Sequence, residues 1–160
     1  MKSAEYWIKH LNLTSHPEGG YYDQVLKANQ SITLEGQSPR ALYTSIYFLL
    51  TAENPSRFHR LTADEIWYFH EGDSLTVHLI TPAGNYEVIK LGKNPEAGEE
   101  LQAVVPKGTI FGSTVEEGYA LVSCMVAPGF EYQDFELFKR DTLLAIYPEY
   151  EAIIRDLTHN

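Results

Sequence analysis

The sequence is poor in cysteine, because Cys124 is the only one among its 160 residues. A single cysteine excludes an intrachain disulfide framework, and its position inside the apolar run 119–126 predicts a buried, reduced thiol that is chemically inert. The sequence also lacks any apolar stretch long enough to cross a membrane, and its first residues contain no apolar signal core. We therefore expect a cytoplasmic protein.

Basic residues are also scarce. Lysine and arginine number 12 against 22 aspartates and glutamates, which gives a formal net charge of −10. A nucleic-acid-binding surface needs clustered positive charge to neutralise phosphates, and an anionic membrane surface attracts the same kind of patch. No run of lysine or arginine occurs here. The composition therefore argues against nucleic-acid and membrane partners.

The pattern of apolar residues predicts a β-domain with helices at both ends. Apolar residues recur at helical spacing from Ala4 to Leu11, and short β-rich runs separated by Gly, Pro and Asn clusters follow from Tyr21 to Ala127. The helical period returns from Leu143 to Leu157, interrupted by Pro148. We expect one domain over residues 1–160, with an all-β sandwich or barrel, a short N-terminal helix and two short C-terminal helices.

The candidate chemistry centres on His59 and Glu65, which are followed by Gly72. This spacing resembles the metal motif of the cupins, in which two histidines flank one residue and a glutamate and a glycine follow. Leu61 stands at the position of the second histidine, and Phe111 follows a Pro-x-Gly turn where the last histidine belongs. Because a transition-metal site needs three or four nitrogen or oxygen ligands, we expect no metal and no other cofactor.

Strand geometry brings His59 and Glu65 toward one another if the segment 62–64 is the turn of an antiparallel hairpin. Alternate side chains of a strand share one face, so both residues can point inward and meet across the ladder. A carboxylate beside His59 would raise the pKa of the imidazole and fix its tautomer, as a general base requires. The alternative is a buried, hydrogen-bonded pair with a purely structural role.

Three sequence blocks together carry a more specific resemblance. They are HPEGGYY at 16–22, DEIWYFHEG at 64–72 and APGFEYQDFE at 127–136. The chain resembles a small, largely uncharacterised family of the cupin superfamily. This resemblance implies a cupin-type jelly-roll β-barrel that forms a homodimer, and it implies no established reaction. Members of the family have been compared with dTDP-sugar epimerases, cupins that work without metal through a histidine base.

Two tyrosines and an arginine extend the candidate site. Tyr47 and Tyr68 could supply the phenolic acid that an epimerase pairs with its base, although tyrosines are equally typical of strands. Arg57 could hold an anionic substrate group through bidentate contacts, or it could be a solvated residue at the edge of a strand.

The remaining substrate-binding candidates are polar or apolar wall residues. Glu18 could reach over the mouth of the barrel as a second acid, or its carboxylate could cap the tight turn made by the two following glycines. Trp67 shares the inward face of its strand with Glu65, and Leu61 and Phe111 would shape an apolar floor. We therefore include all four as substrate-binding residues.

Two further features favour structural roles. His16 precedes a proline that holds its backbone extended, so we interpret it as structural. The acidic and aromatic segment 131–136 could be a binding loop, but its aromatic residues and Phe130 could equally pack the C-terminal helices onto the barrel. We favour packing.

The first functional hypothesis is a metal-independent isomerase or epimerase that binds a small polar or sugar-like molecule. His59 would be the base, Glu65 would orient it, and a tyrosine would return the proton. The second hypothesis is a cupin that binds a small molecule without turnover. The third is a metal-dependent oxygenase or isomerase that uses His59, Glu65 and a ligand that the motif does not reveal.

Overall fold

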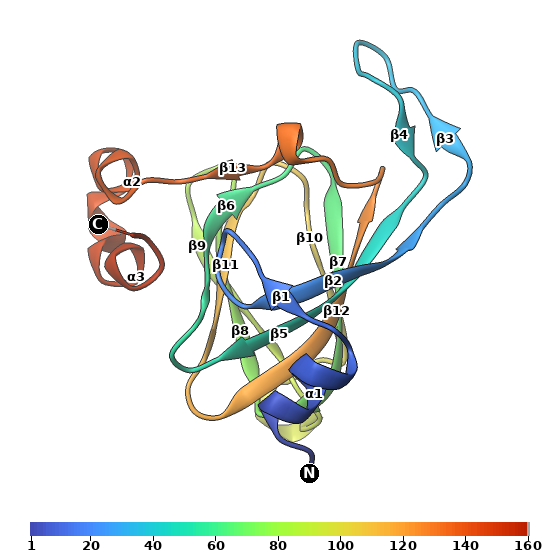
Figure 1. Cartoon of the computed structure of the whole chain (residues 1–160). Coiled ribbons are helices and arrows are strands. Elements are labelled where there is room, and N and C mark those ends of the chain that lie inside the picture. The colour runs from blue at the N-terminus through green and yellow to red at the C-terminus, as the bar shows by residue number, and fades with distance from the viewer. Residues whose placement is uncertain (160) are drawn as a thin grey trace.

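The computed structural model describes residues 1–159, and its strands form two large sheets that face each other (Figure 1). The six-stranded sheet contains, in spatial order, β1 (Thr14–Ser15), β2 (Tyr21–Lys27), β5 (Thr44–Thr51), β12 (Tyr119–Ala127), β7 (Asp64–Gly72) and β10 (Gln102–Val105). The five-stranded sheet contains β13 (Glu136–Leu137), β6 (Ser56–Arg60), β11 (Ile110–Val115), β8 (Leu75–Ile80) and β9 (Tyr86–Leu91).

The connections between strands repeatedly cross from one sheet to the other. β12 lies between β5 and β7, and β11 lies between β6 and β8, so strands distant in sequence become neighbours. All of these ladders are antiparallel. Two antiparallel sheets joined in this way form a jelly roll. The predicted all-β, cupin-type jelly roll is therefore confirmed.

The expected hairpin between β6 and β7 is wrong. β6 pairs with β11 and β13, whereas β7 pairs with β12 and β10 on the opposite sheet. The link 61–63 therefore crosses between the sheets. Pairing with β12 gives β7 a ladder that runs from Asp64 to Gly72, and the five-residue β6 could not offer one of that length. The inward alternation is satisfied either way, because both sheets turn one face to the same core.

The core lies between the two sheets, and β7 shows how the sequence specifies it. Burial alternates along this strand, with Glu65, Trp67 and Phe69 buried and the residues between them less so. Val77 and Leu79 of β8 meet this face from the other sheet within one hydrophobic cluster. Side chains from both inner faces thus fill the interior. Glu65 is an exception to this apolar filling and marks the polar end of the barrel.

The helices cover the outer faces of the barrel, as predicted. α1 (Ala4–His10) begins at Ser3, whose Oγ accepts a hydrogen bond of 3.1 Å from a backbone N–H, and it packs on the six-stranded sheet. α2 (Arg140–Ile146) and α3 (Glu151–Asp156) pack on the five-stranded sheet (Figure 1). Short 3₁₀ turns occupy Pro95–Ala97, Tyr132–Asp134 and Pro148–Tyr150. Within residues 1–159 no helix is long and apolar enough to span a membrane.

A small arm projects from the barrel. β3 (Ser31–Ile32) and β4 (Arg40–Ala41) pair only with each other, and Figure 1 shows them extending away from the two large sheets. Ile32, Leu34 and Leu42 are exposed on or beside this arm. A two-stranded ribbon is marginally stable by itself, so an apolar arm of this kind gains stability when another surface covers it.

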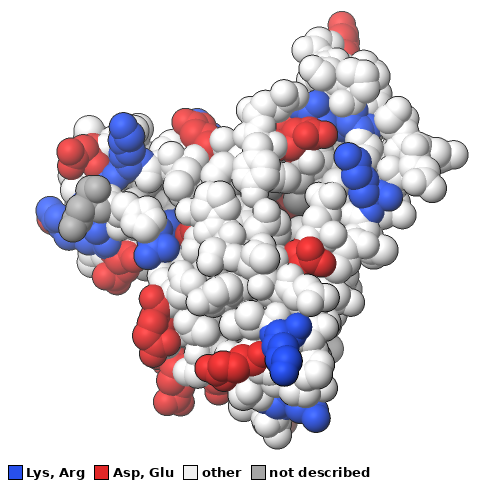
Figure 2. Space-filling model, viewed as in Figure 1, with Lys and Arg blue, Asp and Glu red and all other residues white. Residues whose placement is uncertain are grey.

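The surface charge is not concentrated in one basic patch on the face that Figure 2 shows. Uncharged side chains cover most of the area over β1, β2 and β5, and basic side chains lie near the C-terminal helices, by the projecting arm and by α1. Acidic side chains gather below the C-terminal helices in the same view. The charged side chains on this face therefore surround a largely uncharged centre.

Candidate functional site

A cavity of about 260 Å³ lies between the sheets at the polar end of the barrel. Its volume is near the small end of the range of ligand pockets, roughly 300–1,000 Å³. Both sheets and the loop after β12 contribute side chains to its wall. They are His16, Glu18, Tyr22, Gln24, Thr44, Ile46, His59, Leu61, Glu65, Cys124, Val126, Phe130, Tyr132 and Phe135.

A tight turn between β1 and β2 carries Glu18 into this cavity. The N–H of His16 donates to the carbonyl of Gly20, and the N–H of Gly19 donates back to the carbonyl of His16, each at a distance of 3.0 Å. Gly19 has a φ of +110°, and a Cβ there would collide with the carbonyl oxygen of Pro55. The sequence HPEGG therefore allows the turn to lie directly against the strand that bears His59.

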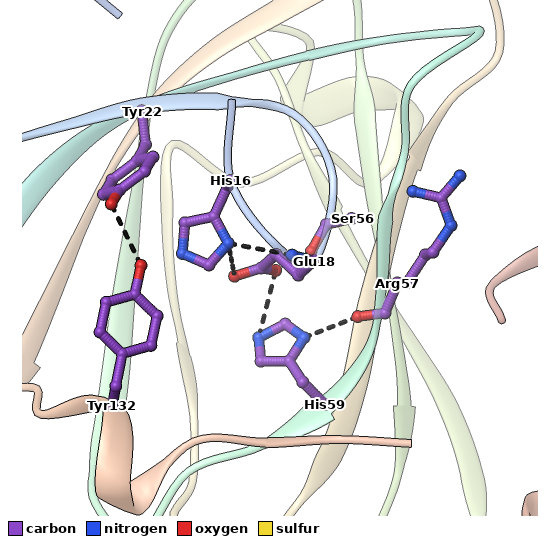
Figure 3. A network of polar contacts seen from close by, with 7 residues as sticks. All are labelled: His16, Glu18, Tyr22, Ser56, Arg57, His59 and Tyr132. Atoms are coloured by element: carbon purple, nitrogen blue, oxygen red, sulfur yellow. Dashed lines mark hydrogen bonds and ion pairs between the residues drawn. The ribbon is translucent and has the colours of Figure 1, made fainter. Parts of the chain in front are cut away.

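Glu18 is the centre of a buried polar network (Figure 3). Its Oε2 accepts a hydrogen bond from the hydroxyl of Ser56 and lies 3.3 Å from Nε2 of His59. Its Oε1 lies 3.4 Å from Nδ1 of His16. Glu18, Ser56 and His59 are all buried, at 6%, 0% and 2% exposure. The carboxyl group thus joins two imidazoles that come from different parts of the chain.

The hydrogen bonds of the two imidazoles fix their tautomers. Nδ1 of His59 lies 2.7 Å from the carbonyl oxygen of Arg57, which can only accept, so this nitrogen carries the proton. Nδ1 of His16 accepts a hydrogen bond of 3.1 Å from the backbone N–H of Glu18, so the proton of a neutral His16 is on Nε2. The lone pair on Nε2 of a neutral His59 therefore faces Oε2 of Glu18, whereas the lone pair on Nδ1 of His16 is already used by the backbone N–H of Glu18.

Burial moves the pKa values of this cluster toward its uncharged forms. Burial raises the pKa of Glu18 well above its ordinary value, and the nearby Glu65 adds to the rise while the Ser56 hydrogen bond opposes it. Burial also lowers the pKa of His59 to about 3 and that of His16 to about 4. These shifts favour a neutral carboxyl beside neutral imidazoles over an ion pair, and the single carboxyl proton can be donated to Nε2 of His59.

Glu65 occupies another part of the cavity wall and has a different partner. Burial raises its pKa to about 7, against an opposing hydrogen bond from the thiol of Cys124. The pKa of that thiol is raised well above its ordinary value, mainly by burial and then by Glu65. Among the described residues no hydrogen bond or ion pair joins Glu65 to His59. The predicted contact between these two residues is therefore wrong, and Glu18 holds the position beside His59.

The apolar candidates divide between the cavity wall and the core behind it. Leu61 lines the cavity. Phe111 packs behind the ring of His59, with ring centroids 4.1 Å apart. Trp67 lies in the core with its centroid 6.0 Å from that of Phe48 and 6.4 Å from that of Phe111, and its indole N–H is buried without a partner. Trp67 and Phe111 therefore support the wall from behind and do not line the cavity.

The predicted tyrosines and arginine lie outside the cavity. Tyr47 and Tyr68 alternate with inward residues and do not belong to the cavity wall. The side chain of Arg57 points away from the network in Figure 3, although its carbonyl group orients His59. Two other phenols reach the site instead. The hydroxyl oxygens of Tyr22 and Tyr132 lie 3.1 Å apart at the cavity wall.

Residue-by-residue interpretation missed the contribution of His16 and of the segment 130–135. His16 was interpreted as structural, yet it lines the cavity and contacts Glu18. Phe130, Tyr132 and Phe135 also line the cavity, whereas we expected them to pack the C-terminal helices. The sequence does contain a signal for these residues, because the two turn-rich blocks 16–22 and 127–136 carry titratable and aromatic side chains together.

The residues at the cupin metal positions do not fit a metal. Leu61 and Phe111 provide hydrocarbon where the pattern requires imidazole. In the part of the chain that the structure describes, no group of three or more His, Cys, Asp or Glu side chains is arranged to hold a metal ion.

Comparison with known proteins agrees with this architecture. Residues 5–138 match the family model described as Cupin superfamily (DUF985). The uncharacterized protein YML079W of Saccharomyces cerevisiae is 30% identical over 156 residues, an alignment that covers 86% of this chain and 76% of that protein.

Two solved structures match this chain over nearly its whole length. A hypothetical protein from Leishmania major has a TM-score of 0.94 and 43% identity, covering 99% of this chain and 100% of its own. Protein SO0799 from Shewanella oneidensis has a TM-score of 0.93 and 46% identity, with 99% of both chains covered. Oxalate decarboxylase from Bacillus subtilis, with a TM-score of 0.58 and 14% identity over 89% of this chain and 36% of that one, shares the fold.

Proposed function

Because this chain belongs to the DUF985 family of the cupin superfamily, we propose that its barrel binds a small polar molecule and moves a proton on it without a metal, as an isomerase or epimerase. The observation that carries this proposal is the position of the buried carboxyl group of Glu18 against Nε2 of His59 at the cavity wall. Such a group can give up a proton while a neighbouring base takes one.

The proposed step keeps protons and electrons balanced. Nε2 of His59 takes a proton from the carbon beside a ligand carbonyl, and the electron pair of that C–H bond forms a C=C bond. The carbonyl π electrons move to oxygen, which takes the proton of Glu18 and gives an enol. The neutral pair thereby becomes an imidazolium beside a carboxylate, and each charge stabilises the other in the buried site. Return of a proton to the other face or to the other carbon completes the isomerisation.

Three groups at the site support this assignment of roles. Nδ1 of His59 donates to the carbonyl of Arg57, which holds Nε2 toward Glu18 and stabilises the imidazolium that forms. Ser56 donates to Glu18 and favours the carboxylate product. Tyr132, whose hydroxyl lies beside that of Tyr22, is the phenol we propose for returning the proton, in place of the outward tyrosines.

A direct test is hydrogen exchange in D₂O. A panel of small 2-hydroxy ketones and keto sugars is incubated with the protein, and NMR measures deuterium uptake at the carbon beside the carbonyl. We expect His59→Asn and Glu18→Gln each to reduce the exchange rate at least about 100-fold. The matched controls are His78→Asn and Glu71→Gln, since both residues lie outside the cavity wall. Exchange that persists in the two cavity variants would contradict the proposal.

A second candidate function is binding without turnover. The observation that favours it is the mainly apolar and aromatic wall, which includes Leu61, Ile46 and Val126 and suits retention of a ligand. This candidate predicts saturable binding with no exchange at any carbon. In that case His59 and Glu18 act as hydrogen-bonding anchors, and their variants weaken affinity only.

A further inference from the structure

Three aromatic rings form a corner in the cavity wall. The rings of Phe130, Tyr132 and Phe135 are nearly perpendicular in every pair, with interplanar angles of 79°, 70° and 78°. Their centroids are 5.0, 6.1 and 6.0 Å apart in the same order. All three residues line the cavity. We call this set the aromatic corner.

Two more rings extend the corner across the cavity. The ring of Tyr22 lies 4.5 Å from that of His16, and the hydroxyl of Tyr22 contacts that of Tyr132 over 3.1 Å. The ring of His16 also lies 5.9 Å from that of Phe135. The loop after β12 and the first strands of the six-stranded sheet therefore bring aromatic groups to one small volume, although they are far apart in sequence.

The carboxyl groups at this volume face no lysine or arginine, and burial disfavours a charge on the two imidazoles there. Glu18 and Glu65 line the cavity, whereas no lysine or arginine belongs to its described wall. Arg57 points away from it, and Arg40 is held by Asp134 through hydrogen bonds of 2.8 and 2.9 Å. A ligand anion would thus find two acids and no cation. The anchor that the sequence suggested for an acidic substrate group is not present at this wall.

We propose that the cavity binds a ligand that carries a small ammonium group, with the cation against the aromatic corner and close to the carboxyls of Glu18 and Glu65. Aromatic faces attract cations through their negative quadrupole, most strongly where water is excluded. A cation bound beside Glu18 and Glu65 would favour their ionised forms, which burial otherwise disfavours. This inference names the ligand class for the proposed function and rests on the cavity being its site.

Binding of matched probes tests the ligand class without any assay of turnover. Choline is compared with its uncharged isostere 3,3-dimethylbutan-1-ol and with the anion 3,3-dimethylbutanoate, by calorimetry and by the shift in melting temperature. We expect choline to bind at least about tenfold more tightly than the alcohol, and the anion to be the weakest of the three. Equal or tighter binding of the alcohol, or no stabilisation by choline or by tetramethylammonium, would overturn the proposal.

Variants separate the aromatic contribution from simple packing. Tyr132→Leu keeps an apolar side chain and removes the ring, so it should abolish the preference for choline over the alcohol while the alcohol still binds. Glu65→Gln should reduce the same preference. Tyr86→Leu is the matched control, because Tyr86 lies on β9 away from the cavity and should leave the preference unchanged. An unchanged preference in Tyr132→Leu contradicts the role of the corner.

The same binding assay distinguishes this inference from the proposed function. A protein that binds the alcohol better than choline and still exchanges hydrogen would refute the ligand class alone. Preference for choline without exchange on any substrate would refute the proton-transfer function alone.

Discussion

Nε2 of His59 lies 3.3 Å from Oε2 of Glu18, so the acid beside this imidazole comes from the turn that precedes β2 and not from the strand that follows β6. The hydroxyl of Ser56 donates to the same carboxyl oxygen. All three side chains are buried. This relationship decides which substitutions at the site are informative.

Substitutions of Glu18 should separate its structural and chemical roles. Glu18→Gln preserves shape, but Ser56 and His59 contact the same carboxyl oxygen, so the amide can either donate to His59 or accept from Ser56 at that position. We therefore expect a smaller loss in the free energy of unfolding than for removal of the side chain. Glu18→Ala leaves Ser56 and His59 without this partner and should cost about 1–3 kcal/mol. Urea denaturation measures both. A large loss of stability in Glu18→Gln, equal to that of Glu18→Ala, would show that the charge of Glu18 holds the fold.

The inward positions in this barrel could be predicted from sequence, whereas the sheet partners could not. Alternation correctly placed Glu65 and His59 toward the interior. The link 61–63 is compatible with either a hairpin or a crossing between sheets, because local residues are similar in both. The choice depends on distant strands such as β12, whose pairing with β7 no local pattern encodes.

The aromatic wall was missed for a related reason. Phe130, Tyr132 and Phe135 stand in a segment without strand or helix periodicity, so their direction could not be deduced from spacing. The structure shows that Arg40 and Asp134 join this segment to the end of β4, which orients the loop over the cavity. Contacts between such distant residues decide the direction of a loop.

The buried carboxyl of Glu65 should make stability depend on pH. Its pKa rises from the ordinary 4.5 to about 7 on folding, so the folded protein binds more protons between these values and the free energy of unfolding falls as the pH rises through this window. Across this pH window the free energy of unfolding decreases by about 3 kcal/mol because of Glu65. His16 and His59 act in the opposite direction. Because folding lowers their pKa values, the free energy of unfolding decreases as the pH falls below 6.5.

Comparison with Glu65→Gln isolates the carboxyl from the histidines. The difference in the free energy of unfolding between the variant and the original protein should grow in favour of the variant from about pH 4 to about pH 8 and level off above. Denaturation at several pH values measures this difference. A difference that is independent of pH would show that Glu65 has an ordinary pKa in the folded protein.

The projecting arm predicts self-association. The family resemblance implies a homodimer, and the exposed Ile32, Leu34 and Leu42 on and beside β3 and β4 are the apolar residues that we expect at its interface. Sedimentation equilibrium should give twice the mass of one chain. The double variant Ile32→Asp, Leu34→Asp should shift the protein toward monomer, whereas the exposed Val88→Asp on β9 should not. A monomeric original protein would contradict this prediction.

The turn that carries Glu18 should be the most sensitive backbone position of the site. Gly19 combines a φ of +110° with contact against the carbonyl of Pro55, so Gly19→Ala adds both backbone strain and a steric clash. We expect the free energy of unfolding to decrease by about 2–5 kcal/mol, together with loss of the His59 to Glu18 contact.

Gly36→Ala is the matched control, because Gly36 also has a positive φ of +74° but no atom within 4 Å of an added Cβ. It should cost only the strain, about 1–2 kcal/mol, and should leave hydrogen exchange at the cavity intact. Equal costs for the two variants would mean that the turn moves away from Pro55 without penalty, and Glu18 would then be positioned by its own hydrogen bonds and not by the turn.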